Sequence, residues 1–309
     1  MKNESQPLIS VIVPVYNGEK TLFHALTGVL KQTFSCLEII VVDDGSDNPV
    51  EAFIHPLLED NRISVYRTER SNANVARNFG IGKSKGDYIA MLDSDDYWME
   101  SHLMDCLTLL KESDAQGLYG SLQLINSLSG NNHSLPVFIA RELKEGESMI
   151  DYLLTTVFGA QTSTIFTTAR SMKDILWNPL LIDHQDYDFV VRFYRKYKMA
   201  VKKTPTVLYS LSSGRNTHYE SCIRFVEDNL KDIHPEIYNK YNFNMYVRTL
   251  QKEETKKFSN YFRKESIRYR ELLSYQKYIS ICNPQNCIQE WIDKIRFIIY
   301  ILWIRSEEK

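Results

Sequence analysis

The sequence predicts an α/β fold in which a mostly parallel sheet is flanked by helices, with a helical extension at the C-terminal end. Two observations carry this prediction. In the first third of the chain, short runs of apolar, β-branched residues alternate with segments whose apolar residues recur at helical spacing. This alternation is typical of parallel strands joined by crossover helices. From about Ser221 onward the pattern is helical only, in a charged segment rich in Tyr, Lys and Asn.

Each element of the first third has its own signal. The strands are continuous apolar runs, as expected for strands buried on both faces, and lie at 8–15, 38–43, 63–66 and 88–92. The helices have apolar residues three and four apart, and lie at 22–30, 50–58 (despite Pro56) and 73–83. In the more mixed second half we expect strands at 118–125 and 163–167, and helices at 149–158 and 186–198.

Length and composition limit the possible functions. A chain of 309 residues exceeds the usual size of one domain, and we divide it into 7–117, 118–215 as the second half of the same domain, and the extension 216–309. The net charge of −2 argues against a nucleic-acid-binding protein, which would be basic. The cysteines number five, with no C-x-x-C pair, which argues against disulfides and zinc and favours a reducing compartment. With neither a signal peptide nor a membrane-spanning stretch in the sequence, we expect a cytoplasmic protein.

Polar side chains follow three of the predicted strands. Tyr16 and Asn17 follow the first strand, Asp43 and Asp44 end the second, and the run Asp93-Ser94-Asp95-Asp96 follows the fourth. In open parallel sheets, ligands bind beyond the carboxyl ends of the strands. The sequence therefore predicts a binding site where these groups converge.

The acidic run places three carboxylates within four residues. Unpaired, these groups would repel one another, and a divalent cation would relieve the repulsion; hard oxygen ligands select Mg²⁺ or Mn²⁺. The alternative is an acidic turn that caps the helix starting near residues 100–102.

Other polar residues also have two interpretations each. An acidic residue of the segment 43–46, Asp43 or Asp44, is either an acceptor for a base or ribose, or part of an Asx turn. Arg77 either pairs with phosphate or a site carboxylate, or is a solvated helix residue. Asp186 and Asp188, with Arg192 one turn beyond, begin a helix. They are either helix N-terminal acids favoured by the macrodipole, or they supply a general base for an acceptor hydroxyl.

Four segments together resemble a known family. They are Ser-Val-Ile-Val-Pro-Val-Tyr-Asn at 10–17, Val-Val-Asp-Asp-Gly-Ser at 41–46, Ala-Arg-Asn-x-Gly at 76–80 and Leu-Asp-Ser-Asp-Asp at 92–96. In this order and spacing they resemble the nucleotide-binding half of family-2 glycosyltransferases with the A-type fold. The resemblance covers 7–110 closely and extends loosely to 211. It implies a Rossmann-like, nucleotide-sugar-binding half at 7–117 and an acceptor-binding half at 118–215.

The resemblance also implies an activity. Such an enzyme transfers a sugar from a UDP-sugar to an acceptor hydroxyl with inversion, using Mn²⁺ or Mg²⁺. A lipid-linked glycan in O-antigen, capsule or other bacterial surface polysaccharide synthesis is the implied acceptor. Asp95 would bind the metal, and Asp186 would be the catalytic base. The implied donor-binding residues are Pro14, Tyr16, Asn17, Asp44, Arg77, Asp93 and Ser94.

The sequence departs from the family pattern at two places. Gln185 replaces the commoner glutamate before the base. The family's Arg-x-His after the strand ending at Tyr209 is absent, because the chain reads Ser-Leu-Ser at 210–212; Arg215 or His218 could replace that contact. The residues expected on the acceptor or diphosphate side are Gln185, Asp188, Arg192, Arg215 and His218.

Two other functions stay open. A catalytically silent sugar-nucleotide-binding protein would fit the two departures. A nucleotide-dependent oxidoreductase would fit the sheet, but no G-x-G-x-x-G follows the first strand. At the C-terminal end, apolar residues recur at helical spacing from Ile288 to Trp303 beside basic residues. This segment is either a helix lying on a membrane surface, which would make the protein peripheral to the inner face of the cell membrane, or a helix packed on the domain or a partner chain.

Overall fold

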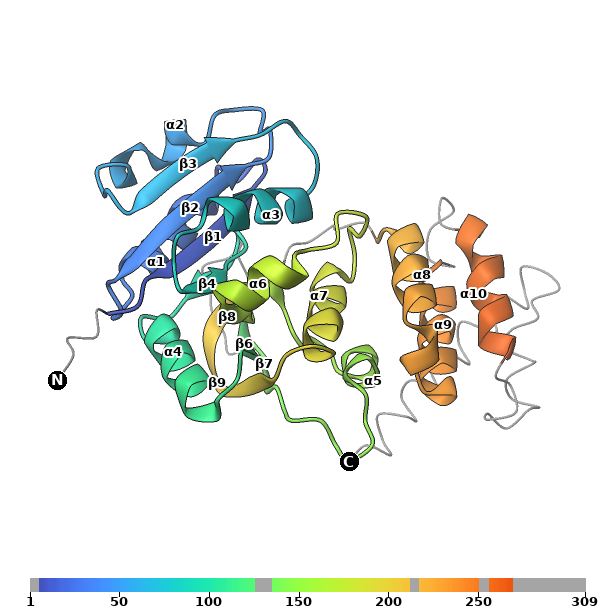
Figure 1. The fold of residues 1–309 in the computed structure, drawn as a ribbon. Helices are drawn as coiled ribbons and strands as arrows, with labels where there is room; N and C mark the ends of the chain where they lie inside the picture. The colour runs from blue at the N-terminus through green and yellow to red at the C-terminus, as the bar shows by residue number, and fades with distance from the viewer. Residues whose placement is uncertain (1–5, 126–134, 212–216, 250–255, 269–309) are drawn as a thin grey trace. The chain divides into compact units, whose positions relative to one another are not determined.

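The computed structural model describes residues 6–125, 135–211, 217–249 and 256–268 (Figure 1). The chain divides into two compact units, Met1–Asp228 and Asn229–Lys309. The division therefore falls one helix later than the expected boundary at 215, because α8 (Tyr219–Asp228) belongs to the first unit. The sequence-predicted helix at 288–303 lies outside the described residues, as does Arg215.

The first half of the sheet is parallel, as predicted. Strand β1 (Ile9–Val15) pairs in parallel with β2 (Leu37–Asp43) on one side and with β4 (Tyr88–Met91) on the other. Strand β3 (Ile63–Arg67) extends the sheet beyond β2, also in parallel. All seven residues of β1 are buried, which explains why this strand is apolar at every position but Ser10 rather than alternating.

Three helical segments accompany these strands (Figure 1). Helices α1 (Leu22–Leu30) and α3 (Ala73–Lys83) have the predicted bounds. The side chain of Asn72 caps α3 by accepting hydrogen bonds from the backbone N–H groups of residues 74 and 75. The expected helix at 50–58 is shorter: α2 covers Glu51–Ile54 and a 3₁₀ turn follows over His55–Leu57. Pro56 accounts for the break, because proline lacks the N–H that a continuing α-helix needs.

The second half of the sheet is mixed. Its strands run in the order β4-β8-β6-β9-β5, with β7 paired to β6. Pairing is antiparallel between β4 and β8 and between β8 and β6, and parallel between β6 and β9. The expected strand at 163–167 is a 3₁₀ turn followed by a shorter strand. The strands are β5 (Tyr97–Trp98), β6 (Gly117–Ile125), β7 (Val137–Phe138), β8 (Phe166–Thr168) and β9 (Met199–Ser210).

Helices connect and cover these strands. Helix α4 begins at His102, and its N-cap residue is Ser101, so the acidic run at 93–96 does not cap it. Helix α7 starts at the predicted place but ends before residue 198. The helices are α4 (His102–Ser113), α5 (Met149–Thr155), α6 (Ala169–Ile175) and α7 (Gln185–Tyr194).

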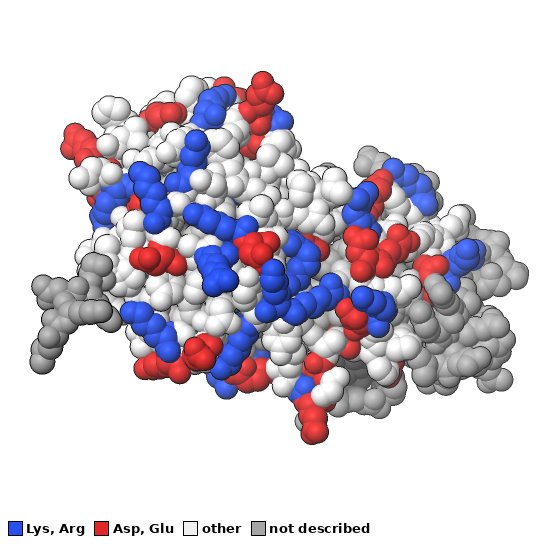
Figure 2. All heavy atoms as spheres, in the orientation of Figure 1, with Lys and Arg blue, Asp and Glu red and all other residues white. Residues whose placement is uncertain are grey.

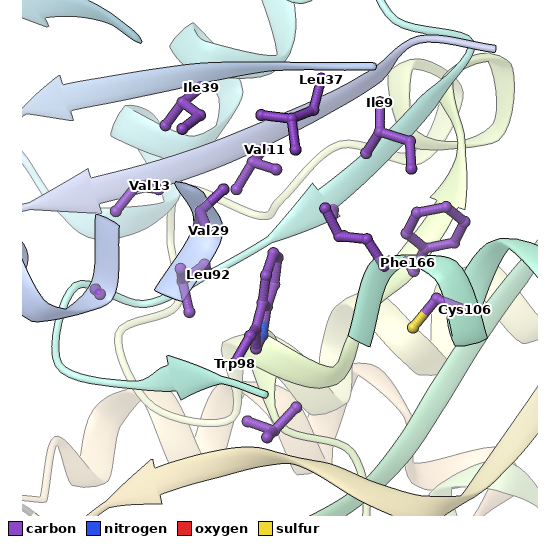
Figure 3. Close-up of a cluster of buried hydrophobic side chains, with 14 of the residues drawn as sticks. Ile9, Val11, Val13, Val29, Leu37, Ile39, Leu92, Trp98, Cys106 and Phe166 are labelled. Carbon is purple, nitrogen blue, oxygen red and sulfur yellow. The ribbon is translucent and has the colours of Figure 1, made fainter. Parts of the chain in front are cut away.

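A hydrophobic core joins the two halves of the first unit. Figure 3 shows Trp98 between side chains of the parallel strands, such as Val11, and residues of the second half, such as Cys106. Trp98 is fully buried, and its indole N–H donates to the carbonyl of Ser163 at 2.8 Å. The hydrogen bond satisfies the one polar atom of this side chain, so the large ring is buried without a desolvation penalty.

The second unit contains two described helices, α9 (Pro235–Thr249) and α10 (Lys256–Arg268). They lie side by side (Figure 1), and the hydroxyl of Tyr238 donates to Glu265 at 2.8 Å. The helical character of the extension is therefore confirmed over these residues.

In the part of the chain that the structure describes, no helix has the length and apolar character that crossing a membrane requires. Figure 2 shows acidic and basic side chains interspersed on the face in view.

Gly80 allows α3 to approach the sheet closely. A Cβ atom there would lie 2.6 Å from Cγ2 of Ile12 and 3.2 Å from Cγ2 of Val42. Two residues along the same helix, a Cβ on Gly82 would meet no atom within 4 Å.

We predict that Gly80→Ala lowers the free energy of unfolding by about 1–3 kcal/mol, because an extra methyl group overpacks this contact. Gly82→Ala is the matched control, and should raise it by about 0.5–1 kcal/mol through helix propensity alone. Urea denaturation measures both. Equal effects of the two substitutions would show that α3 does not depend on this close approach.

Candidate active site

A cavity of about 700 Å³ opens at the carboxyl ends of β1, β2 and β4. It brings together residues far apart in the sequence, as the strand-end argument predicted. Eight of the lining residues are those that the sequence motifs assigned to the donor and its metal, and two more were expected on the acceptor or diphosphate side. These ten residues are Pro14, Tyr16, Asn17, Asp44, Arg77, Asp93, Ser94, Asp95, Gln185 and His218.

The two aspartates at the end of β2 have different roles. Asp43 is buried and closes the turn: its Oδ1 accepts the Ser46 N–H at 2.8 Å, and its Oδ2 pairs with Arg67 at 2.8 Å. Asp44 lines the cavity. Gly45 between Asp44 and Ser46 has φ +70°, and a Cβ there would lie 2.7 Å from the backbone nitrogen of Arg70. Both sequence interpretations therefore apply, the Asx turn to Asp43 and the cavity to Asp44.

Arg70 contacts two of the implied donor-binding residues, Tyr16 and Asp44. Its guanidinium lies 3.5 Å from the centre of the Tyr16 ring, within the range of a cation–π contact. The same guanidinium forms an ion pair with Oδ2 of Asp44, whose Oδ1 accepts hydrogen bonds from the N–H and hydroxyl of Ser71, both at 2.9 Å. Arg70 lines the cavity but sequence reasoning missed it. It follows the third strand, which ends at the same edge, so the strand-end rule would have found it.

Asn17 links the turns after β1 and β2. It has a left-handed backbone conformation, with φ 51°, which asparagine tolerates better than most residues. Its backbone N–H donates to the Ser46 hydroxyl, and its amide exchanges two hydrogen bonds with Asp47, all at 2.9 Å. This contact holds the Tyr16 turn and the Asp44 turn together at one wall of the cavity.

Arg77 is buried rather than solvated. Its side chain is only 2% exposed and donates to Oδ1 of Asp93 at 2.6 Å and to Oδ1 of Asn74 at 2.8 Å. Its guanidinium also lies 4.5 Å from the centre of the Trp177 ring. The sequence interpretation in which Arg77 locks a site carboxylate is the one that this geometry supports.

The three carboxylates of the acidic run point to different partners. Asp93 is held by Arg77, and Asp95 is exposed at the cavity wall. Asp96 is buried, where it accepts hydrogen bonds from the Ser163 hydroxyl and from the Ser210 N–H at 2.9 Å. Burial, followed by the charges of Asp95 and Asp93, raises the pKa of Asp96 well above its ordinary value. Two of the three carboxylates therefore have protein partners, Arg77 for Asp93 and the two serines for Asp96.

The carboxylates at the cavity wall fit a metal ion that binds together with a diphosphate. Among the described residues, no group of three His, Cys, Asp or Glu side chains is arranged to hold a metal ion alone. Mg²⁺ and similar ions commonly bind through one or two carboxylates plus substrate phosphates. Asp95, on the cavity wall beside Asp93, provides such an oxygen ligand.

Helix α7 brings its first turn to the cavity. Gln185, its first residue, lines the cavity. Asp186 follows and is partly buried, and its Oδ1 accepts the N–H of Tyr187 at 3.0 Å. Asp186 itself is not among the lining residues, so its role as a base stays a prediction.

Asp188 and Arg192 hold α7 to the preceding loop. Asp188 is buried and pairs with Arg192 at 2.7 Å, and Arg192 also donates to the carbonyls of Ile175 and Leu176 at 2.7 and 2.9 Å. Burial raises the pKa of Asp188, and Arg192 opposes this shift. Neither residue lines the cavity, so the structure gives this pair a role in positioning α7, and its expected contact with the acceptor or diphosphate stays a prediction.

His218 reaches the cavity from the start of α8. Its backbone N–H donates to the carboxylate of Asp183, in the loop before α7. Its expected contact with the diphosphate stays a prediction.

Asp96 yields a prediction about pH. Since burial raises its pKa in the folded state, its ionisation penalises folding; the penalty is absent below the pKa of the unfolded chain and grows as pH rises above it. We predict that the unfolding free energy of Asp96→Asn, relative to wild type, increases between about pH 3.5 and 7 in the presence of a chelator.

Asp60→Asn is the control of opposite sign, because Arg62 lowers the pKa of Asp60. The unfolding free energy of Asp60→Asn, relative to wild type, should fall over the same pH range, because the wild-type carboxylate ionises and gains its ion pair. Chemical denaturation at several pH values measures both variants. A relative stability of Asp96→Asn that falls with pH would contradict the raised pKa.

Comparison with known proteins extends the family resemblance beyond the four sequence motifs. The model of the family described as glycosyl transferase family 2 matches residues 10–175. Glycosyltransferase GlyG of Streptococcus pneumoniae is 29% identical over 285 residues, which are 89% of this chain and 94% of the relative. The amylovoran biosynthesis glycosyltransferase AmsB of Erwinia amylovora is 30% identical over 59% of this chain and 62% of its own length.

An Escherichia coli relative, UDP-Glc:alpha-D-GlcNAc-diphosphoundecaprenol beta-1,3-glucosyltransferase WfgD, is 33% identical over 43% of this chain and 51% of its own length. Among solved structures, S. aureus TarS 1-349 in complex with UDP-GlcNAc has a TM-score of 0.57 at 20% identity, covering 93% of this chain and 78% of TarS. This similarity shows a shared fold. With the family model matching more than half of the chain, the protein belongs to glycosyl transferase family 2.

Proposed function

We propose that this glycosyltransferase moves a sugar from a UDP-sugar to an acceptor hydroxyl with inversion, using a divalent metal ion. The observation that supports this proposal most directly is the cavity, which gathers every residue that the motifs assigned to the donor. The relative WfgD, whose name specifies a UDP-glucose donor and a diphosphoundecaprenol-linked acceptor, supports a lipid-linked glycan as the acceptor. The reaction would then belong to surface polysaccharide synthesis, such as O-antigen or capsule, at the cytoplasmic face of the membrane.

The nucleobase binds at the wall formed by Tyr16 and Asp44. Tyr16 is 43% exposed, so one ring face is available for stacking once Arg70 moves. Asp44 supplies a carboxylate oxygen that can accept the N3–H of uracil. Uracil binding at this place therefore replaces both contacts of Arg70, the cation–π contact and the ion pair.

The diphosphate lies between this wall and the acidic run. Asp93, fixed by Arg77, faces the ribose side, and Asp95 holds the metal ion. The bound metal offsets the negative charge that grows on the departing diphosphate. Lys20 and His218 line the same cavity and add positive charge or hydrogen-bond donors.

Asp186 acts as the general base. It removes the proton of the acceptor hydroxyl while the hydroxyl oxygen forms a bond to the anomeric carbon. The bond between that carbon and the diphosphate oxygen breaks on the opposite face, which inverts the configuration. The protein contributes by holding acceptor and donor in line, and the placement of Asp186 directly after the cavity residue Gln185 supports this role.

Two substitutions separate binding from chemistry. Asp95→Ala should abolish the metal dependence of UDP binding, which calorimetric titration with and without Mn²⁺ measures. Asp186→Asn should bind UDP as wild type does but lower turnover by roughly 10²–10⁴ with the UDP-sugar that wild type uses, because it removes the base.

A panel of UDP-sugars titrated into wild type identifies that donor first. Full activity of Asp186→Asn would refute the base assignment. Metal-dependent binding that survives in Asp95→Ala would refute the metal site.

Arg70 provides a further test of the base pocket. Arg70→Ala should bind UDP more tightly, by roughly 3- to 20-fold, because UDP no longer displaces a cation–π contact and an ion pair. Arg62→Ala, which removes a similar Arg–Asp pair away from the cavity, should leave the dissociation constant unchanged. Weaker binding by Arg70→Ala would mean that Arg70 stays on the bound nucleotide.

A catalytically silent sugar-nucleotide-binding protein is the second candidate function, favoured by Gln185 at the position of the commoner glutamate. It predicts UDP-sugar binding that is normal in affinity and metal dependence but is never followed by UDP release with lipid-linked acceptors. The segment 288–303 stays a predicted membrane-surface helix or packing helix. Flotation with anionic liposomes, with and without that segment, distinguishes the two.

A further inference from the structure

The side-chain amide of Asn74 is buried and forms three hydrogen bonds. It lies on α3, three residues before Arg77, and is fully buried. Its Nδ2 donates to the carbonyls of Asn178 and Leu181, both at 2.7 Å. Its Oδ1 accepts from Nη1 of Arg77 at 2.8 Å. One side chain therefore contacts both the loop before α7 and the arginine that holds Asp93.

The loop at 176–184 leads directly to α7, where Gln185 and Asp186 are the first two residues. Two other asparagines of the α3 region also hold it. Asn72 donates to the carbonyl of Pro179 at 3.1 Å, and Asn78 exchanges two hydrogen bonds of 2.8 Å with the backbone of Trp177. The position of the first turn of α7 thus depends on how this loop is held against α3.

The opposite end of the loop is also fixed. The Ser221 hydroxyl of α8 accepts the N–H groups of Ile182 and Asp183 at 2.9 and 3.1 Å, and donates to the Asp183 carbonyl at 2.8 Å. A solvated loop can move while its backbone groups bond to water instead. A loop held on both sides by polar contacts within the protein transmits a displacement to the next helix more readily.

Arg77 connects Asn74 to the donor side of the cavity. Its Nη2 donates to Asp93 at 2.6 Å, so Asp93, Arg77, Asn74 and the loop carbonyls form one continuous chain of hydrogen bonds. A second path runs through rings: Arg77 lies over Trp177, which stacks on Phe189 of α7 with ring centres 4.7 Å apart. The Nε of Arg77 is buried without a hydrogen-bond partner among the described residues, so only the two terminal nitrogens of the guanidinium form hydrogen bonds.

We propose that Asn74 is a positioning residue that couples occupancy of the donor pocket to the placement of the loop at 176–184, and so of Gln185 and Asp186. This inference rests on the proposed function, in which the nucleotide contacts Asp93. A nucleotide that fixes Asp93 fixes Arg77, and Arg77 fixes the Asn74 amide whose N–H groups hold the loop. A bound donor then further stabilises the placement of the acceptor-side turn.

Asn74→Asp separates the two contacts of this residue. The carboxylate retains an oxygen that accepts from Arg77, but presents a second oxygen, with no hydrogen, to the carbonyls of Asn178 and Leu181. Arg77 and Asp93 therefore stay paired while the loop loses its two donors and meets electrostatic repulsion. Asn78→Ala is the matched control, because it breaks two hydrogen bonds to the same loop and none to Arg77.

The experiment is hydrogen–deuterium exchange of the full chain, with and without saturating UDP and Mn²⁺, read on peptides that cover residues 176–187. In wild type and in Asn78→Ala, UDP should slow exchange of these peptides about fivefold or more, the range of typical coupling between sites. In Asn74→Asp, UDP should bind with about the wild-type affinity, yet leave their exchange unchanged. If Asn74→Asp does not fold, Asn74→Ala replaces it, with weaker UDP binding expected as well.

The outcomes distinguish failure of the proposed function from failure of this inference. UDP that fails to bind wild type refutes the proposed function, and the inference with it. UDP that binds wild type without slowing exchange in the loop overturns the inference alone. The inference also fails if UDP slows exchange equally in Asn74→Asp, because the loop would then respond without the link through Asn74. It fails as well if Asn78→Ala loses the effect, because the response would then depend on any contact that holds the loop and not on the link to Arg77.

Discussion

The buried ion pair between Arg77 and Asp93 is the interaction on which the rest of the site depends. Arg77 is almost completely removed from solvent, and a buried guanidinium is tolerated only when its charge is paired and hydrogen-bonded. The pair fixes one carboxylate of the acidic run at the cavity. It also requires α3 to lie close to the sheet, which Gly80 permits.

The site shows how a fold separates three like charges that the sequence places side by side. One carboxylate pairs with a buried arginine, one faces the cavity, and Asp96 is enclosed by Ser163 and Ser210. Burial raises the pKa of this third group, and the charges of Asp95 and Asp93 raise it further. Under the proposed function, Asp95 at the cavity wall would bind a metal ion whose other ligands come from the diphosphate.

The loop between α6 and α7 joins the two halves of the site, although it contributes few lining residues. Asparagine amides of the α3 region hold it on one side, and a serine of α8 holds it on the other. Its own sequence gives little indication of this role, because its partners lie about 100 and 40 residues away in the chain. The Asp188–Arg192 pair completes the arrangement by attaching α7 to the end of α6.

The sequence by itself determined the strand–helix alternation, the parallel first half of the sheet and the set of residues at the strand ends, because apolar periodicity and strand direction are local properties. Four ordered motifs identified the family. Only the tertiary structure decided which aspartate closes a turn and which faces the cavity, and that Arg77 is buried. It alone revealed Arg70 over the Tyr16 ring and the antiparallel insertion of β8. These features depend on contacts between segments distant in the chain, and the burial and pKa of a side chain follow from those contacts rather than from its neighbours in sequence.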